Sequence, residues 1–323
     1  MASFLRRFSS SSTKSDKDNN AVTLVHLEEI RDHQDRIVEE MNTNFIHRDE
    51  EIYAPLLVRD MKWDGFKERV LHCGCGSGRT GFTHFLPQIY LHDSHLFAMD
   101  TSEQLVSYAA MKYPHASVTY TVGDVTSDNF PFKWTTFDKI FAIHVLQCVK
   151  DYRGGLARFF DFLRPGGQLG VTYATQLFTD FLDREFSHDE KWKNYFEDLP
   201  EESERSESFQ HAFHTCLDSL GFEVKKIKTE PMEYTFPSLE KAVVYYIGTS
   251  PYVKGIPAEL RDPFEEDCLE KMTTEFNISQ ISDPFHATYD CLVVVAIKPP
   301  AEEEKHEKSG GKLKSLRSRL SLP

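Results

Sequence analysis

The chain has 323 residues and a formal net charge of −14, with 40% hydrophobic and 27% charged residues. This balance is typical of a globular protein of one large domain or two smaller ones. The segment 15–300 holds 28 basic and 47 acidic side chains, a net charge of −19. Because such a surface repels phosphate backbones, we expect no nucleic-acid partner. No apolar stretch reaches the roughly 18 residues of a membrane-spanning helix.

Both ends of the chain differ from the middle. Residues 1–14 carry three basic side chains and no acid, and a serine run follows a short apolar stretch. This pattern predicts a disordered tail over 1–20, with an organelle-import segment as the alternative. Residues 301–323 hold six basic and four acidic side chains and predict a second disordered, charged tail, with a short surface-binding amphipathic helix as the alternative.

The six cysteines indicate no metal site. Cys73 and Cys75 are separated by one residue, which is the wrong spacing for a zinc motif, and there is no second close pair. Reduced thiols are the simplest interpretation. We therefore expect a cytoplasmic protein, with a mitochondrial location as the alternative that the N-terminal residues leave open.

In chain order, the hydrophobic pattern alternates between helices and short buried strands. Residues 26–41 have helical spacing. Strands are expected over 69–73, 95–99, 118–122, 137–143 and 168–173, with helices over 103–112 and 152–163 between them. This order predicts a parallel sheet with right-handed crossovers. Two closing strands are expected over 222–227 and 291–297.

Two longer segments, 175–215 and 232–285, are rich in aromatic residues. We expect them, together with 21–60, to form a helical cap over one end of the sheet. The whole of 21–300 is then one α/β domain.

The strongest motif is VLHCGCGSGR, in which Gly74, Gly76 and Gly78 directly follow the first predicted strand. Glycines there let the backbone turn sharply and approach a ligand closely, and the next helix would direct its N–H groups at that ligand. Nucleotides bind at this place in doubly wound sheets. The motif is ambiguous, because Gly76 to Gly81 also satisfies the GxGxxG pattern of dinucleotide-binding enzymes.

Two carboxylates favour a different cofactor. Asp100 closes the second strand, where it can accept hydrogen bonds from both hydroxyls of a ribose. Asp124 follows the third strand, where it can bind an adenine amino group. The glycine that directly follows the first strand is Gly74, which gives the pattern GxGxG and not GxGxxG.

With these motifs, residues 70–297 resemble the class I S-adenosylmethionine-dependent methyltransferases, and more closely the juvenile hormone acid O-methyltransferases. The resemblance rests on the glycine turn, on Asp100 with the following SEQLV, on Phe137 with Asp138, and on the segment 178–192. It implies a Rossmann-like, doubly wound seven-stranded sheet whose last strand is antiparallel, with a helical cap over the cofactor cleft. It also implies methyl transfer from S-adenosyl-L-methionine to the carboxylate of a small apolar acid of farnesoic or juvenile-hormone type.

The resemblance assigns the glycine turn to the methionine part of the cofactor, the carboxylate after the second strand to the ribose, and the carboxylate after the third strand to the adenine. His72 stands where the family has an aspartate near the cofactor's amino group, so we expect it to contact the cofactor, with a core histidine as the alternative. The expected cofactor-binding residues are His72, Gly74, Cys75, Gly76, Gly78, Asp100 and Asp124.

Two departures from the family concern the methyl acceptor. Ile46 and Cys148 stand where the family has the glutamine and the tryptophan that orient the substrate carboxylate. Restoring both is predicted to raise methyl ester formation. The expected catalytic residues are His144, as a base or as a replacement hydrogen-bond donor, and Gln147, as a donor to the carboxylate.

The residues leave alternatives open. A carboxylate has a reference pKa of about 4, so it needs alignment but no general base, whereas an amine or hydroxyl acceptor needs deprotonation. A methyltransferase acting on such an acceptor is therefore one alternative, favoured by His144. A cofactor-binding protein without turnover is another, and a nicotinamide enzyme is the third.

Overall fold

The computed structural model describes residues 44–128, 130–132, 136–175, 178–197, 199 and 209–300. The helix expected over 26–41 and both expected tails lie outside these residues.

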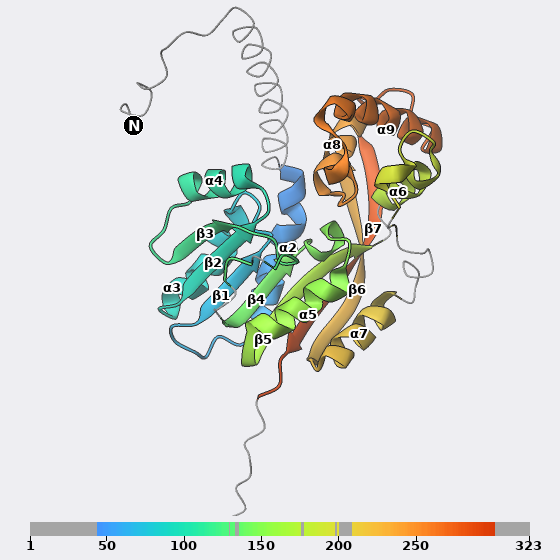
Figure 1. Ribbon diagram of the computed structural model, residues 1–323. Helices are drawn as coiled ribbons and strands as arrows, with labels where there is room; N and C mark the ends of the chain where they lie inside the picture. Colours follow the sequence, from blue (N-terminus) through green and yellow to red (C-terminus); the bar gives the residue numbers. More distant parts are fainter. Residues whose placement is uncertain are drawn as a thin grey trace, which may run out of the picture.

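A seven-stranded sheet in the order β3-β2-β1-β4-β5-β7-β6 forms the centre of the molecule (Figure 1). The neighbours from β3 to β5 are parallel, and β7 is antiparallel to both β5 and β6. This topology confirms the expected sheet and its antiparallel last strand. The strands are β1 Arg69–Cys73, β2 His95–Asp100, β3 Val118–Val122, β4 Phe137–Ile143, β5 Leu163–Thr175, β6 Glu223–Phe236 and β7 Phe285–Ile297.

The described α-helices are α2 Asn44–Asp60, α3 Leu86–Leu91, α4 Glu103–Lys112, α5 Tyr152–Phe162, α6 Phe178–His188, α7 Phe209–Leu220, α8 Leu239–Thr249 and α9 Arg261–Glu275. Short π- and 3-10 turns are η1 Gly81–Phe85, η2 Leu146–Cys148, η3 Lys193–Tyr195, η5 Val253–Gly255 and η6 Ala258–Leu260. Polar caps start two of the helices that follow strands. The Ser102 hydroxyl accepts a hydrogen bond from Leu105 N, and the Asp151 carboxylate accepts one from Gly154 N.

Two buried clusters cover the two faces of the sheet. On one face, Tyr53 and Leu57 of α2 pack with Phe141 of β4. On the other face, α5 and α7 contribute Phe159 and Phe213 to a cluster with the remaining strand side chains. The helices α2 and α7 begin in segments expected to form the cap, yet both pack on the sheet because they carry apolar stripes that the sheet buries.

The cap is built on the two closing strands, which are longer than expected. Strands β6 and β7 stay paired out to Phe236 and Phe285, so residues 232–236 are strand and not helix. Figure 1 shows α6, α8 and α9 gathered around this far end, where a third buried cluster forms. The extra length of β6 escaped prediction because this edge strand alternates exposed and half-buried residues and lacks a continuous apolar run.

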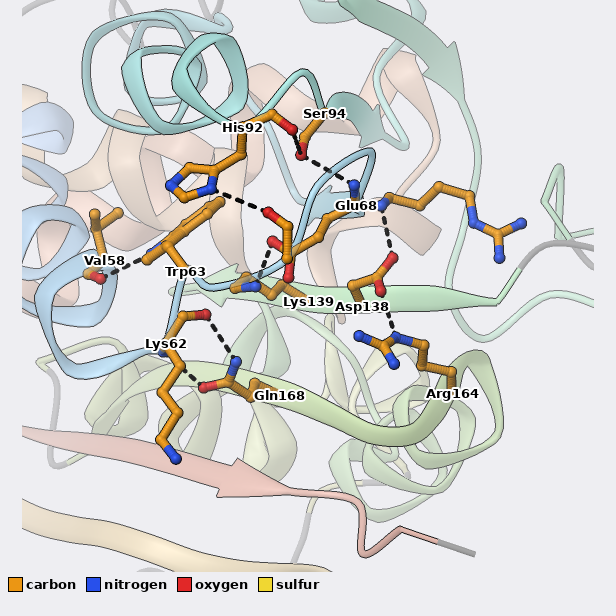
Figure 2. Close-up of polar contacts among 12 residues, drawn as sticks. Val58, Lys62, Trp63, Glu68, His92, Ser94, Asp138, Lys139, Arg164 and Gln168 are labelled. Carbon is orange, nitrogen blue, oxygen red and sulfur yellow. Dashed lines mark hydrogen bonds and ion pairs between the residues drawn. The ribbon is translucent and has the colours of Figure 1, made fainter.

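A polar network closes the opposite, amino-terminal end of the sheet (Figure 2). The Lys139 ammonium is buried, pairs with the buried Glu68 carboxylate at 2.5 Å, and lies 4.6 Å from the centre of the Trp63 ring. The Gln168 amide accepts from Lys62 N and donates to Lys62 O. These contacts fix the segment between α2 and β1 against β4 and β5, and so fix where β1 delivers the glycine turn.

Candidate functional site

The glycine turn after β1 needs its glycines for two reasons. Gly74, Gly76 and Gly78 all have positive φ, at 68°, 52° and 82°, where other residues are strained. A Cβ on Gly74 would lie 2.2 Å from a Val145 methyl carbon, and a Cβ on Gly78 would lie 2.7 Å from the Ala109 Cβ. At Gly76 a Cβ would meet nothing within 4 Å, so this residue leaves bare backbone at the edge of an open space.

That space is a pocket at the carboxyl ends of β1, β2 and β4, and residues of the cap line its opposite side. Six residues that the sequence analysis singled out come together in its lining: Gly74, Gly76, Asp100, Asp124, His144 and Cys148. The cap side of the lining is largely aromatic, with Phe178, Tyr234, Phe236, Tyr245 and Tyr289. The same edge of the sheet is where doubly wound proteins bind nucleotides.

Asp100 ties the end of β2 to the glycine turn. One carboxylate oxygen accepts a hydrogen bond from Gly76 N at 2.9 Å, and the other accepts from Ser102 N at 2.9 Å. Burial raises the pKa of Asp100, and these two N–H groups and the nearby Lys254 offset part of the rise. The Asp100 carboxylate therefore stabilises the glycine turn and also lines the pocket. The residue spacing alone did not indicate the contact with the turn.

Asp124 has a local partner as well. One of its carboxylate oxygens accepts hydrogen bonds from Thr126 N at 2.8 Å and from the Thr126 hydroxyl at 2.7 Å. This turn holds the carboxylate at the end of β3. Its place in the lining is compatible with the expected contact to adenine, and that contact stays a prediction.

His72 lies within β1 and is 1% exposed, and it is absent from the pocket lining. Its ring meets Phe85 edge-on with centroids 4.9 Å apart. Burial lowers the pKa of His72 to about 4, and the charge of Glu50 opposes that shift in part. This position favours the alternative of a neutral core histidine. Cys75 is likewise buried, with a thiol pKa that burial raises, and it and Gly78 shape the turn from outside the lining.

His144 occupies a strained backbone position directly after β4. Its φ is 54°, a conformation that costs a non-glycine residue about 1–3 kcal/mol and is concentrated at functional sites. Its N–H is held by both the carbonyl and the hydroxyl oxygen of Thr172, at 3.2 and 3.1 Å. The sequence indicated the residue and its place but not the strain.

Gln147 lies beside His144 and lines a second pocket. Its side-chain Nε2 is 3.2 Å from His144 Nδ1. With the Gln147 amide nitrogen donating, Nδ1 accepts and a neutral imidazole carries its proton on Nε2; the flipped amide would instead accept from Nδ1. The two expected catalytic residues are thus brought together.

Cys148 lies where the two pockets meet and lines both. Its thiol points toward His144 O at 3.6 Å, and burial raises the pKa of that thiol to about 11. A tryptophan there would fill the junction, and the expected gain from restoring one stays a prediction. Ile46 falls on α2, but its side chain lies outside the described part of the chain.

Sequence reasoning missed Glu50 and Lys254 in the lining. Glu50, on α2, accepts a hydrogen bond from the Thr80 hydroxyl. The charged residues around Glu50 predict only the exposed face of a helix. Lys254 lies in a short VKG turn whose sequence predicts no ligand contact. Within the described ranges, no cluster of three or more His, Cys, Asp or Glu side chains could hold a metal ion. No helix in the described part of the chain is long and apolar enough to cross a membrane.

Comparison with known proteins agrees with this geometry. Residues 71–171 match the family model of a methyltransferase domain. The chain is 22% identical to the juvenile hormone acid O-methyltransferase of Bombyx mori over 65% of this chain and 76% of that protein. It is 22% identical to the enzyme of the same name in Drosophila melanogaster over 74% of this chain and 84% of that protein. The solved YcgJ protein of Bacillus subtilis is 17% identical, covering 78% of this chain and 100% of that one, with a TM-score of 0.46.

Residues 71–171 therefore form a class I S-adenosylmethionine-dependent methyltransferase domain, and S-adenosyl-L-methionine is the cofactor of this domain family. The described residues fit that cofactor. The bare backbone at Gly76 and the carboxylates of Asp100 and Asp124 border one pocket, which matches a ligand with amino and hydroxyl donors along its length. When bound, the cofactor supplies an electrophilic methyl group.

Proposed function

We propose that this methyltransferase transfers the methyl group to the carboxylate of a small apolar acid. The observation that carries the proposal is the position of His144, which lines a largely aromatic pocket and lies beside Gln147. In the tautomer whose Nδ1 accepts from the Gln147 amide, the imidazole Nε2 is a hydrogen-bond donor. A donor suits a carboxylate, which is already ionised at neutral pH and needs only to be held in line and kept from water.

The shape of the site supports an apolar acceptor. The cap side of the lining presents five aromatic rings, and the second pocket continues past Cys148 along Tyr173, Tyr245 and Tyr252. Such a lining offers apolar contact with few polar anchors, which is how sites for small lipophilic ligands are built. Both curated relatives are named as methyltransferases of juvenile hormone acid, which agrees with this class of acceptor.

One observation favours a second candidate, an amine acceptor. Asp180 and the buried Asp183 line the second pocket, where a carboxylate would attract an ammonium group. Asp183 already accepts hydrogen bonds from the Tyr246 hydroxyl at 2.8 Å and from the Ser250 hydroxyl at 3.3 Å. These contacts reduce its capacity for a ligand, so the acid acceptor is the better candidate.

The test is incubation of the full chain with methyl-labelled cofactor and matched series of isoprenoid, fatty and aromatic acids, each beside its alcohol and amine. We expect label only in base-labile methyl esters. We also expect a rate that changes little from about pH 6.5 to 9, because no proton has to be removed from the acceptor. Label in the amine series would overturn the proposal, and no label in any series would indicate a cofactor-binding protein without turnover.

The role of His144 is tested by two substitutions. His144→Phe keeps a ring but removes the donor, and it should lower kcat/KM for the acid by about 10- to 100-fold, the value of a hydrogen bond to a charged group. His144→Asn keeps a donor and tolerates the left-handed backbone, so it should retain more activity. Equal rates in all three proteins would contradict the donor role.

A further inference from the structure

Charge is unevenly distributed in the main pocket. Three carboxylates, those of Glu50, Asp100 and Asp124, stand in its lining. Among the described lining residues, Lys254 is the single lysine or arginine. An acidic ligand in the main pocket meets three like charges and one opposite charge, so Lys254 is the most favourable place there for its carboxylate.

The fold holds the backbone of Lys254 in place at the pocket edge. Lys254 is the middle residue of η5, and Tyr252, Val253 and Ile256 beside it are buried in the cap cluster. Gly255 N donates to Tyr252 O at 3.2 Å, and Ile256 N donates to Val253 O at 3.0 Å. Because its neighbours are anchored, the exposed Lys254 side chain projects from a fixed point.

The Lys254 charge acts on both sides of the pocket. Burial raises the pKa of Asp100 at the end of β2 and that of Cys148 after β4, and the Lys254 charge offsets part of each rise. No described carboxylate forms an ion pair with Lys254 within 4 Å. The ammonium is thus within electrostatic reach of the junction of the two pockets, where no described carboxylate competes with a ligand for it.

We propose that the Lys254 ammonium binds the carboxylate of the acceptor acid and selects acids over neutral molecules of the same shape. This inference rests on the proposed function. Methylation converts the carboxylate to a neutral ester, which keeps no ion pair with Lys254. The same contact that favours entry of the acid therefore favours departure of the product.

The test is calorimetric titration of the full chain, saturated with S-adenosylhomocysteine, with farnesoic acid and with its neutral methyl ester. Lys254→Met should weaken binding of the acid by about 10-fold, as expected for one charged contact, and leave binding of the ester unchanged. Lys254→Arg should keep most of the affinity for the acid. Lys112→Met, the same change on the exposed end of α4, is the control and should alter neither affinity.

Several outcomes would overturn the proposal. Equal weakening of acid and ester would indicate a steric effect, and a loss of S-adenosylhomocysteine affinity in Lys254→Met would assign the lysine to the carboxylate of the cofactor. An unchanged affinity for the acid would also overturn it. If the wild type binds the acid but does not methylate it, the proposed function fails while the binding assay still tests Lys254. If the wild type binds no acid at all, both fail.

Discussion

Charged side chains are arranged in opposite ways at the two ends of the same parallel strands. At the amino ends, the buried Lys139 and Glu68 neutralise each other, and the Gln168 amide is satisfied by backbone groups (Figure 2). At the carboxyl ends, three carboxylates share a pocket with one lysine. The first arrangement is complete without a ligand and supports the fold. The second has more negative than positive charge, which the hydrogen-bond donors of a ligand can balance. It also contains the strained backbone of His144.

The largest effect is expected at the amino end. Lys139→Met leaves the Glu68 carboxylate buried without its cation, which should lower the free energy of unfolding by about 3–5 kcal/mol. Denaturant titration measures this change. Adding Glu68→Gln should recover much of the loss, because no bare charge then remains. The affinity of the folded protein for S-adenosylhomocysteine should stay the same, and a fall in that affinity would contradict the separation between the two ends.

His72, between the two ends, gives a prediction for pH. The folded protein holds its pKa at about 4, below the ordinary 6.5, so between these values the unfolded chain binds a proton that the folded chain does not. The contribution of His72 to the free energy of unfolding should therefore be fully present above pH 6.5. It should fall by about 3 kcal/mol as the pH drops toward 4. Unfolding titrations of wild type and His72→Leu measure this, and the variant should show a flatter dependence. Identical slopes would show that other groups carry the effect.

At the carboxyl end we expect the smallest change in the free energy of unfolding and the largest change in affinity for S-adenosylhomocysteine. Asp100→Asn keeps the shape but removes the charge and one acceptor, and it should weaken S-adenosylhomocysteine binding by about 1–3 kcal/mol. The free energy of unfolding should change by less than that amount, since the amide oxygen still accepts one of the two hydrogen bonds, from Gly76 N or from Ser102 N. Calorimetry checks the affinity. If Asp100→Asn binds as tightly as the wild type, the expected ribose contact does not exist.

The sheet was predictable from sequence because its central strands are short apolar runs bounded by turns. Four strands, including Arg69–Cys73 and Phe137–Ile143, lie within one residue of the expected bounds. The two closing strands, β6 and β7, were not predictable in full length. β6 is an edge strand with an exposed face, and residues 285–290 of β7 alternate in the same way, so neither has the apolar signal of a buried strand.

The candidate site was predictable where it depends on strand ends. Asp100, Asp124 and His144 each follow a strand, and a parallel sheet brings such residues together at one edge. Lys254 was not predictable, because its place in the pocket depends on how the cap packs on β6 and β7. The orientation of His72 also escaped prediction, since a residue inside a strand can face either side of the sheet.

The paired arms of β6 and β7 suggest how acceptor size could change during evolution. They carry four lining residues, Tyr234, Phe236, Ala287 and Tyr289, beyond the part of the sheet that β5 joins. Two residues inserted into each of these strands would preserve which side chains face inward. They would move α8 and α9, which lie between the two strands in the chain, outward by about 7 Å, at roughly 3.4 Å per residue. The glycine turn and its carboxylates would stay where they are. The paired ends of β6 and β7 thus set the depth of the pocket, and matched insertions or deletions in them would change chain-length preference while the methyl-donor half of the protein stays constant.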